Sequence, residues 1–555
     1  MRLSYALLTF AAACGAGSND HSAPVNAALD AGGGGISFGG QEDIGEFTSI
    51  LQSGGIPGPD TLDANGFFNE HYAPPPATGC TNTLCMTPGV AVGKAWLTGA
   101  HQAALQLAID TNVDPASYPK LPMNLVVVVD HSGSMAQDGR LDKVKAGLHT
   151  LIDTLDDADR LAIVQFDDTV QVLAPFGATL DRTGLGTIVD GLVPAGGTDI
   201  AAGLAAGFQL DVAALDPARQ SRVILLSDGL ATSGVTDDAQ IMAGADTFIS
   251  QGIGLTTVGV GDEFDVTLMR GLAEHGSGNF YFLEDMNAAT EVFQQELAYF
   301  MSPIALDLQV DAVAGTGYTF GEVVGSTLWA ASPSLGSMHI PAAFVASRTG
   351  VAPDPGTGGR RGGGSMLFIQ LQPTGTNPDG KVADLSLSYR APGSTTVITQ
   401  TVTLAYPNDP TETPDPPYLS APEMAPRFAM YNMFLGLRAA TLDTNPNCAA
   451  ADLAATRAAA TAWNQTQENP DIAADLTLVD LYRANLAAVG ADIDGRYDQT
   501  TCQTAGLGNT GDDPAGEVDD PDCAAPLGCT VGRTPVALAP IALVALAAIR
   551  RRRRR

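Results

Sequence analysis

Basic residues are scarce in this chain of 555 residues, in which 28 lysines and arginines stand against 61 aspartates and glutamates and leave a net charge of −33. Six of the 28 form the terminal run 550–555, so the rest of the chain is more acidic still. Such a body repels phosphate backbones, and nucleic acid is therefore not an expected partner.

Long apolar stretches are also lacking, because no internal run reaches the roughly 20 residues that a membrane-spanning helix needs. Hydrophobic residues nevertheless make up 45% of the chain, which excludes a wholly disordered protein. A single hydrophobic core stops growing at about 250 to 300 residues. We therefore expect several domains, with membrane contact through the termini only.

Signatures of the common enzyme classes are missing as well. The chain has no P-loop, no His-Glu-x-x-His pair and no Gly-x-Ser-x-Gly nucleophile elbow. Its seven histidines are scattered, and none has an evident base or nucleophile beside it. The sequence therefore predicts a protein that is not an enzyme.

The amino terminus, residues 1–14, has the features of a secretory signal: one early base, a short apolar stretch and small residues before a cleavage site. Cys14 directly follows the small residues and resembles the acylated cysteine of a bacterial lipoprotein signal. Ala11 stands where that signal usually prefers leucine, so cleavage without lipidation is the alternative.

The carboxyl terminus, residues 529–555, contains a stretch almost free of polar groups, 534–549, followed by the arginine run. A helix of this length extends about 24 Å, less than the roughly 30 Å of a membrane's hydrocarbon core, so one interpretation is a weak anchor. The order of Gly528-Cys529, apolar stretch and arginines also resembles the myxobacterial carboxy-terminal sorting signal. That resemblance implies removal of the tail. Both ends together predict an exported protein at the cell surface or outer membrane.

Seven cysteines fit an exported chain. The pairs Cys80/Cys85 and Cys448/Cys502 are the natural candidates for disulfides outside the cytosol. Cys523 is then left over, and a Cys523–Cys529 disulfide would compete with any role of Cys529 in the tail. Spacing alone therefore leaves the connectivity open.

Periodicity changes along the chain define the predicted domains. Continuous apolar runs at 125–129, 222–227 and 255–260 alternate with helical patterns, which predicts a doubly wound, Rossmann-like α/β sheet. A period of two then indicates a β-sandwich-like region, and a helical period follows it. The predicted segments are a flexible linker (15–45), an accessory amino-terminal region (46–118), the α/β domain (119–302), the β-sandwich-like region (303–407), a proline-rich linker (408–420), a small helical region (421–502) and an acidic linker (503–528).

Polar residues follow two of the continuous apolar runs. Asp130-His131-Ser132-Gly133-Ser134 comes after the first and Ser227-Asp228-Gly229 after the second, while Gly196-Gly197-Thr198 precedes a helical stretch. Ligands of open α/β sheets bind at the carboxyl ends of the strands, so these loops are expected to meet at one rim. Their carboxylate and hydroxyl oxygens suit Mg²⁺, Mn²⁺ or Ca²⁺ rather than zinc or copper.

These residues, in this order, resemble the metal-ion-dependent adhesion site (MIDAS) of von Willebrand factor type A domains, over about residues 124–300. The resemblance implies a cell-surface protein that binds a protein ligand through a divalent cation, with Mg²⁺ the expected ion. A glutamate or aspartate of the ligand would complete the coordination. His131 has no assigned role. The implied metal ligands are Asp130, Ser132, Ser134, Thr198 and Asp228.

Two other interpretations stay open. Aspartate after a strand is often a helix cap, and serine and glycine are ordinary loop residues, so the site could be merely structural in a passive envelope protein. A haloacid-dehalogenase-like, Mg²⁺-dependent phosphotransferase also has an aspartate after its first strand. That chemistry needs a second carboxylate two residues on, where this chain has Ser132.

Overall fold

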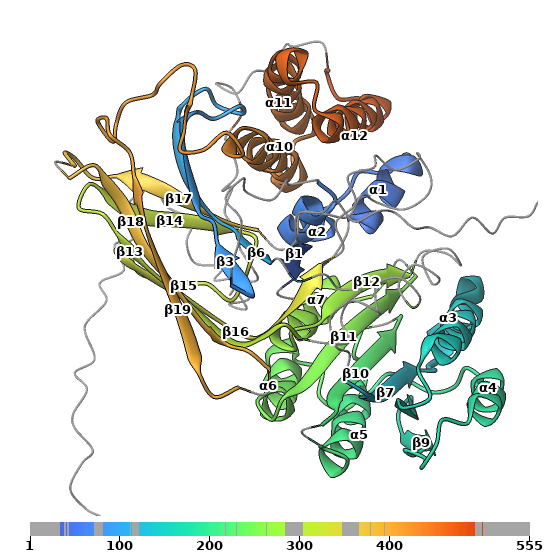
Figure 1. Ribbon diagram of the computed structural model, residues 1–555. Coiled ribbons are helices and arrows are strands. Elements are labelled where there is room, and N and C mark those ends of the chain that lie inside the picture. The colour runs from blue at the N-terminus through green and yellow to red at the C-terminus, as the bar shows by residue number, and fades with distance from the viewer. Residues whose placement is uncertain are drawn as a thin grey trace, which may run out of the picture. The chain divides into compact units, whose positions relative to one another are not determined.

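A computed structural model describes most of the chain between residues 34 and 493 (Figure 1). The described residues are 34–37, 40–41, 44–71, 82–111, 113, 121–216, 218–228, 230–261, 264–283, 293, 303–346, 366–377, 379–392, 394–493 and 502. The predicted signal with Cys14, the residue Cys80, the acidic linker and the carboxy-terminal tail lie outside them.

A seven-stranded sheet occupies the predicted α/β domain. Its central strands are the continuous apolar runs of the sequence, and they are almost entirely buried because helices cover both faces. All neighbouring strands pair in parallel except the last pair, which is antiparallel. The order is β2 (Gly40–Gln41), β12 (Asn279–Leu283), β11 (Ile253–Val260), β10 (Gln220–Ser227), β7 (Met123–Asp130), β8 (Arg160–Phe166) and β9 (Val170–Ala174).

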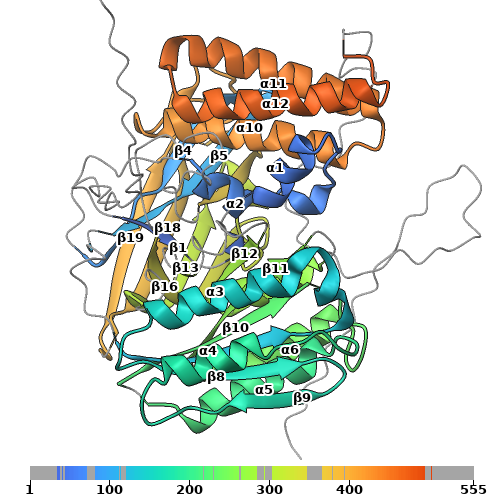
Figure 2. The ribbon, with the colours of Figure 1, turned by 90° about the vertical axis from the view of Figure 1, so that its right-hand side faces the viewer.

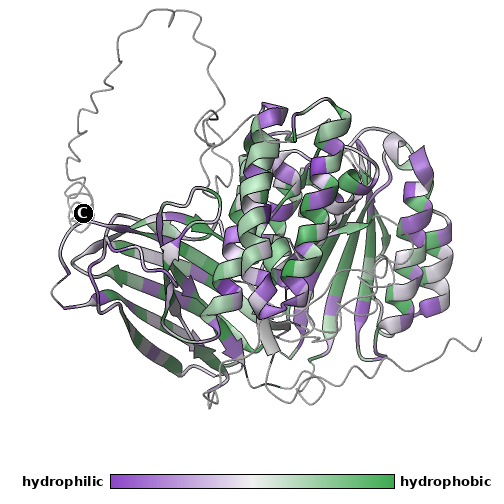
Figure 3. Cartoon of the chain, turned by 90° about the horizontal axis from the view of Figure 1, so that it is seen from above, coloured by the Kyte–Doolittle hydropathy of each residue, from purple (hydrophilic) through white to green (hydrophobic). Residues whose placement is uncertain are grey.

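Alternate residues of β7 pack into two different cores, on the two faces of the sheet. Val127 lies in the core with α3 (Arg140–Thr154) and α4 (Arg182–Asp190), which cover one face in Figure 2. Val128 lies in the core with α5 (Ile200–Ala213), α6 (Asp238–Ile249) and α7 (Val266–His275). Figure 3 shows the strands as largely hydrophobic between helices of mixed hydropathy.

Two further sheets share a third hydrophobic core and form the β-sandwich. One has the order β19 (Val397–Ala405), β18 (Lys381–Arg390), β13 (Ala305–Ala314), β16 (Leu335–Ala346), β1 (Gly34–Ser37), β6 (Ile109–Thr111) and β3 (Leu84–Met86), with β15 (Ala330–Ala331) beside β16. The other has the order β14 (Tyr318–Val324), β17 (Leu367–Pro373), β5 (His101–Leu107), β4 (Gly89–Lys94) and β20 (Tyr418–Leu419). The alternating sequence pattern is that of β13, β17, β18 and β19.

The sandwich contains more of the chain than its sequence pattern indicates. Strands β3 to β6 belong to the predicted accessory region, and β1 belongs to the predicted flexible linker, as does β2 of the α/β sheet. The strand β5 pairs with β17, more than two hundred residues later in the chain. Both β4 and β5 are buried on both faces, so they lack the period of two that marks a half-exposed strand. The strand β20 likewise extends the sheet from within the predicted proline-rich linker.

Three long helices follow the sandwich: α10 (Met424–Leu442), α11 (Pro446–Gln467) and α12 (Pro470–Ala488). They share a core with the early helices α1 (Gly45–Gln52) and α2 (Ala64–Asn69), which precede and follow the 3₁₀ turn Pro59–Thr61 (Figure 1). A disulfide joins Cys448 of α11 to Cys502. Within the described part of the chain, no helix is both long enough and apolar enough to cross a membrane.

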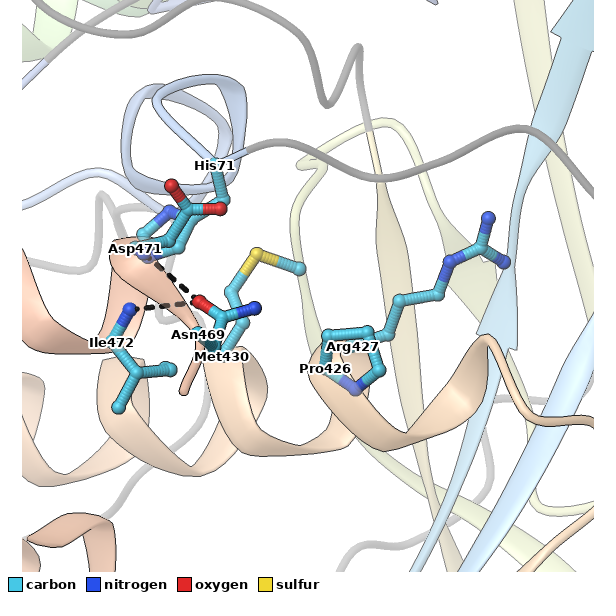
Figure 4. A pocket seen from close by; sticks show the side chains of 7 residues that line it. All are labelled: His71, Pro426, Arg427, Met430, Asn469, Asp471 and Ile472. Atoms are coloured by element: carbon cyan, nitrogen blue, oxygen red, sulfur yellow. Dashed lines mark hydrogen bonds between the residues drawn. The ribbon is translucent and has the colours of Figure 1, made fainter. Parts of the chain in front are cut away.

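His71 connects the early helices to the late ones. Its ring nitrogens lie 2.6 Å from the Phe67 carbonyl oxygen and 2.8 Å from a carboxylate oxygen of Asp475 in α12. Figure 4 shows His71 at a small pocket whose other lining residues include Arg427 of α10 and Asn469. Residues about four hundred positions apart therefore form one buried polar contact.

Candidate metal centre

The predicted site residues lie at the carboxyl edge of the central strands. Asp130 is the last residue of β7, Asp228 directly follows β10, and Thr198 precedes α5 by two positions. Ser132 and Ser134 lie at the start of the 3₁₀ turn Gly133–Gly139, which leads into α3. Parallel strands end at the same edge, so residues from distant parts of the sequence meet there.

Asp130 is fully buried and held by two hydrogen bonds. One carboxylate oxygen accepts the backbone N–H of Ser132 at 2.8 Å, and the other accepts the Ser227 hydroxyl at 2.6 Å. Burial raises the pKa of Asp130 to about 6, with a further rise from the charge of Asp228, while the two hydrogen-bond donors oppose the shift. A buried carboxylate of this kind is stabilised by a positive partner.

Ser132, Ser134 and Asp228 form a continuous row of oxygens. The two serine hydroxyls lie 3.0 Å apart, and Ser134 donates to Asp228 Oδ1 at 2.8 Å. In octahedral Mg²⁺ coordination, bonds of about 2.0 to 2.1 Å place neighbouring ligand oxygens about 2.9 Å apart. The spacing of this row therefore matches one side of a Mg²⁺ coordination shell.

Arg140, the first residue of α3, binds the far side of Asp228. Its Nη1 lies 3.0 Å from Asp228 Oδ2, and the two side chains are only 5% and 0% exposed. Sequence reasoning did not find this residue, because the pairing depends on the fold. The only signal was that Arg140 is a basic residue shortly after Ser132 and Ser134, in a chain poor in bases.

The loop that contains Thr198 is joined through the backbone to the loop that contains Ser132 and Ser134, called the serine loop below. Gly133 donates its N–H to the Gly196 carbonyl oxygen at 3.1 Å. Thr198 is buried, and its backbone N–H donates to the Thr232 hydroxyl at 3.0 Å. Gly196 has a φ of +68°, and a Cβ there would lie 2.6 Å from an oxygen of Asp167, so the loop requires glycine at this position.

A family model described as the von Willebrand factor type A domain matches residues 124–295. This segment is a von Willebrand factor type A domain. Domains of this family are often involved in adhesion and protein interaction. The remaining sheets and helices of the chain lie outside the match.

YfbK of Escherichia coli K12 is 26% identical over 205 residues, which cover 37% of this chain and 36% of YfbK. The chain thus matches little more than a third of that relative. A von Willebrand factor type A protein from Catenulispora acidiphila has a TM-score of 0.47 at 17% identity and covers 71% of this chain and 90% of that chain. Proximal thread matrix protein 1 of the mussel byssus, solved with a zinc-occupied MIDAS motif, has a TM-score of 0.29 at 18% identity, over 35% of this chain and 51% of that chain.

His131 holds the loops of the von Willebrand A domain together, although the sequence assigned it no role. Its Nδ1 lies 2.9 Å from the Val193 carbonyl oxygen, and its own carbonyl oxygen accepts the N–H of Ala195. Its backbone N–H donates to the Phe166 carbonyl oxygen at 3.1 Å. His131 therefore connects the end of β8, the serine loop and the segment that leads to Thr198.

The donor chemistry of the von Willebrand A domain site fits a hard divalent cation. Asp130 and Asp228 supply two negative charges, and the hydroxyls supply neutral oxygens. Among the residues that the structure describes, no group of three or more His, Cys, Asp or Glu side chains is placed to hold a metal. The fit of the site to a cation therefore depends on the serine hydroxyls. The oxygens of Ser132, Ser134 and Asp228 already lie at the spacing of neighbouring ligands of Mg²⁺.

The predicted disulfide residues lie away from this site. Cys85 is disulfide-bonded, and Cys448 and Cys502 are bonded to each other with their Cα atoms 5.5 Å apart. Disulfides persist in oxidising compartments. These bonds are therefore compatible with export.

Proposed function

We propose that this chain is a surface protein of the bacterial envelope whose von Willebrand A domain binds a protein ligand through a divalent cation. The observation that carries the proposal is the row formed by Ser132, Ser134 and Asp228, whose oxygens are 3.0 and 2.8 Å apart at the carboxyl edge of the sheet. Asp130 and Thr198 would complete the set of residues that hold Mg²⁺, or alternatively Mn²⁺ or Ca²⁺.

The bound ion would supply electrostatic attraction for a carboxylate from outside. Two carboxylates balance the charge of the ion, and neutral hydroxyls add none, so an acidic side chain of a ligand still gains from binding. The protein's own residues would orient the ion toward the open edge of the sheet. A glutamate or aspartate of the ligand is therefore the proposed last partner.

The surface beside the site supports a protein ligand. Val193, Leu230 and Val235 are 65%, 55% and 40% exposed, and they lie in the segments that lead to Thr198 and follow Asp228. Those segments touch, since Thr232 and Ser233 donate their N–H groups to the Thr198 carbonyl oxygen. Exposed aliphatic side chains gathered around a polar centre are typical of protein-binding sites.

Export and anchoring rest on the sequence signals. The secretory signal would direct the chain out of the cytosol, Cys14 would be the lipidation site, and the tail at 529–555 would be removed or would insert weakly. The disulfide between Cys448 and Cys502 supports an oxidising location. Metabolic labelling with a radioactive fatty acid tests the first step, because a Cys14→Ser variant would lose the label.

The binding of labelled protein to cell-envelope fractions, with Mg²⁺ and then with EDTA, tests the proposed function. We expect EDTA to abolish binding, excess Mg²⁺ to restore it, and Ser132→Ala to weaken it at least tenfold. Ser250→Ala is the matched control, because Ser250 is exposed at the end of α6 in the same domain.

The alternatives give different results. Binding that survives both EDTA and Ser132→Ala would favour a passive envelope protein in which any metal is structural. Turnover of a phosphate ester would favour the phosphotransferase. Against that activity, the position of its second carboxylate is occupied by Ser132, whose hydroxyl contacts Ser134.

A further inference from the structure

The helix α5 packs closely on the sheet because two of its glycines face the strands. A Cβ at Gly203 would lie 2.7 Å from the ring of Phe166, and one at Gly207 would lie 2.5 Å from Val128 Cγ2. Asp211 is the next residue at this four-residue spacing, so its side chain lies on the same face of the helix. The close packing buries Asp211 completely, at 0% exposure.

Two polar side chains of the strands lie on the face of the sheet that α5 covers. Asn124 of β7 and Ser221 of β10 are partners in the strand register, near the amino ends of both strands. They point to the same side as Val126 and Val223, which belong to the core beneath α5. Asn124 is 0% exposed and Ser221 is 4% exposed. A carboxylate, an amide and a hydroxyl from three elements are therefore buried together, at the edge opposite the predicted metal ligands.

The side-chain oxygens of these three residues lack well-formed hydrogen bonds within the described part of the chain. Asn124 donates its Nδ2 to the Ala214 carbonyl oxygen at 2.7 Å, but its Oδ1 accepts no hydrogen bond. The same holds for Ser221 Oγ and for both carboxylate oxygens of Asp211. The Ser221 hydroxyl nevertheless lies near the Asp211 carboxylate, because it opposes the rise that burial causes in the Asp211 pKa. Buried polar atoms are nearly always paired, so four such oxygens indicate a bound partner.

No basic side chain of the described residues forms an ion pair with Asp211. Arg160 of β8 is the register partner of Asn124 and does not pair with the carboxylate. The Arg222 guanidinium lies on the other face of the sheet, 4.9 Å from the ring centre of Phe344. Asp211 also lies in the last turn of α5, which has no basic residue and whose carbonyl end carries a partial negative charge.

The remaining neighbours leave this charge uncompensated as well. Arg219, directly before β10, donates to two backbone carbonyl oxygens instead. The strand β11 contributes Ile253, the register partner of Ser221. The helix α6 contributes Phe248, whose ring stacks on Phe208 with the ring centres 5.0 Å apart. The site thus combines buried oxygen acceptors with one negative charge.

We propose that the oxygens of Asp211, Asn124 and Ser221 bind a monovalent cation, with Na⁺ the expected ion, between α5 and the strands. Carboxylate, amide and hydroxyl oxygens suit a hard cation. One positive charge neutralises the single carboxylate, whereas a divalent ion would leave a buried positive charge without a partner. A water molecule would leave the carboxylate uncompensated. The proposal does not depend on the metal site at the opposite edge of the sheet.

A proton and the cation compete for the Asp211 carboxylate. Burial raises the pKa of Asp211 to about 7, so the folded protein holds the proton at lower pH. Above that pH, the carboxylate is charged and can bind Na⁺. Binding to the folded state alone stabilises it, so Na⁺ should offset the loss of stability that the charged carboxylate causes in a buffer without alkali cations.

Calorimetric unfolding of the full chain in sodium chloride and in N-methyl-D-glucamine chloride tests the proposal. The two buffers have equal ionic strength and equal Mg²⁺, so they differ only in whether the monovalent cation is small enough to be buried. We expect Na⁺ to raise the unfolding temperature of the von Willebrand A domain by at least about 3 °C at pH 8. At pH 5 the proton occupies the carboxylate, and we expect no difference. Equal unfolding temperatures in the two buffers at pH 8 would overturn the proposal.

Three variants separate this site from diffuse binding of Na⁺ to an acidic surface. Asp211→Asn keeps the shape of the side chain and should lose the response to Na⁺. Ser221→Ala removes one neutral oxygen and should raise the Na⁺ concentration at half of the shift about threefold. Asp153→Asn is the matched control, because it removes one negative charge from the exposed face of α3 and should respond as the wild type does. A response that persists in Asp211→Asn would overturn the site.

Binding can also be measured without unfolding the protein. The transverse relaxation of ²³Na at pH 8 should be faster with the wild type than with Asp211→Asn, and the same with the wild type and Asp153→Asn. Equal relaxation with the wild type and Asp211→Asn would contradict a bound ion at this carboxylate.

Discussion

Asp211, at the end of α5, is a carboxylate in surroundings that oppose its charge. The residue is fully buried, and neither carboxylate oxygen has a well-formed hydrogen bond. Burial raises the pKa of Asp211 to about 7, although the Ser221 hydroxyl and the Arg222 amide lie near enough to moderate the rise. The folded protein therefore retains a proton that the unfolded chain releases at an ordinary aspartate pKa of about 3.9.

Stability should consequently fall as the pH rises from about 4 to about 7, because over this range the folded state binds the proton more tightly than the unfolded state. Asp211→Asn keeps the shape and cannot ionise. We expect it to raise the free energy of unfolding by about 2 to 4 kcal/mol at pH 8 and to change it little near pH 4. Urea unfolding measures the difference, with Asp153→Asn on the exposed face of α3 as the control. Equal stability of variant and wild type at pH 8 would contradict the raised pKa.

Among single residues, the sequence predicted those of the site that lie at the end of a strand or in an adjoining loop. Asp130 and Asp228 follow apolar runs, and the hydroxyl residues lie in the adjoining loops, so strand direction alone brings them to one edge. Arg140 and His131 were not predicted as parts of the site. Their contacts cross between loops and helices, and neither the pattern nor the spacing of the sequence specifies such contacts.

At the scale of elements, His71 joins α2 to α12 through both of its ring nitrogens. Burial opposes a charge on the ring, but the Asp475 carboxylate, the Phe67 carbonyl and the charge of Glu70 together outweigh it and raise the pKa of His71. Both ring nitrogens face an acceptor, so the protonated ring is the form that satisfies both contacts.

The contribution of this contact is fully present below the ordinary histidine pKa of about 6.5 and is lost as the pH rises through the raised pKa. We expect His71→Gln to lower the free energy of unfolding by about 3 kcal/mol at pH 6, with a smaller loss at pH 9. Guanidinium unfolding at both pH values tests this. His149→Gln is the control, since His149 pairs with Asp190 at the exposed surface. A loss that stays constant between the two pH values would refute the protonated contact.

Secondary elements were predictable where burial leaves a clear pattern. The apolar runs became β7, β10 and β11, and the helical period near the end became α10 to α12. The strands β4 and β5 were not predicted, because they are buried against the sandwich on one face and against the helices on the other. The strands β1 and β2 lie in a glycine-rich segment with almost no side-chain pattern, so the sequence did not predict them. Backbone hydrogen bonds join β1 to β16 and β2 to β12.

On the scale of the whole described molecule, the von Willebrand A domain is inserted between the strands of the sandwich. Strands β3 to β6 precede it, and β13 to β19 follow it. Glu274 of α7 accepts the Ser326 hydroxyl at 2.7 Å and the Thr327 N–H at 2.9 Å, in the segment between β14 and β15. Arg222 lies 4.9 Å from the ring centre of Phe344 in β16. These contacts lie toward the edge of the sheet opposite the proposed metal site.

Titration of Mg²⁺ into chelator-treated protein is the measurement that tests the central claim most directly. We predict that the full chain binds one ion per molecule, and that Ser134→Ala, which removes the middle oxygen of the row, weakens the affinity at least tenfold without lowering the thermal unfolding temperature by more than a few degrees. A wild-type protein that takes up no Mg²⁺ or Mn²⁺ at millimolar concentration, or a Ser134→Ala variant with unchanged affinity, would contradict the account.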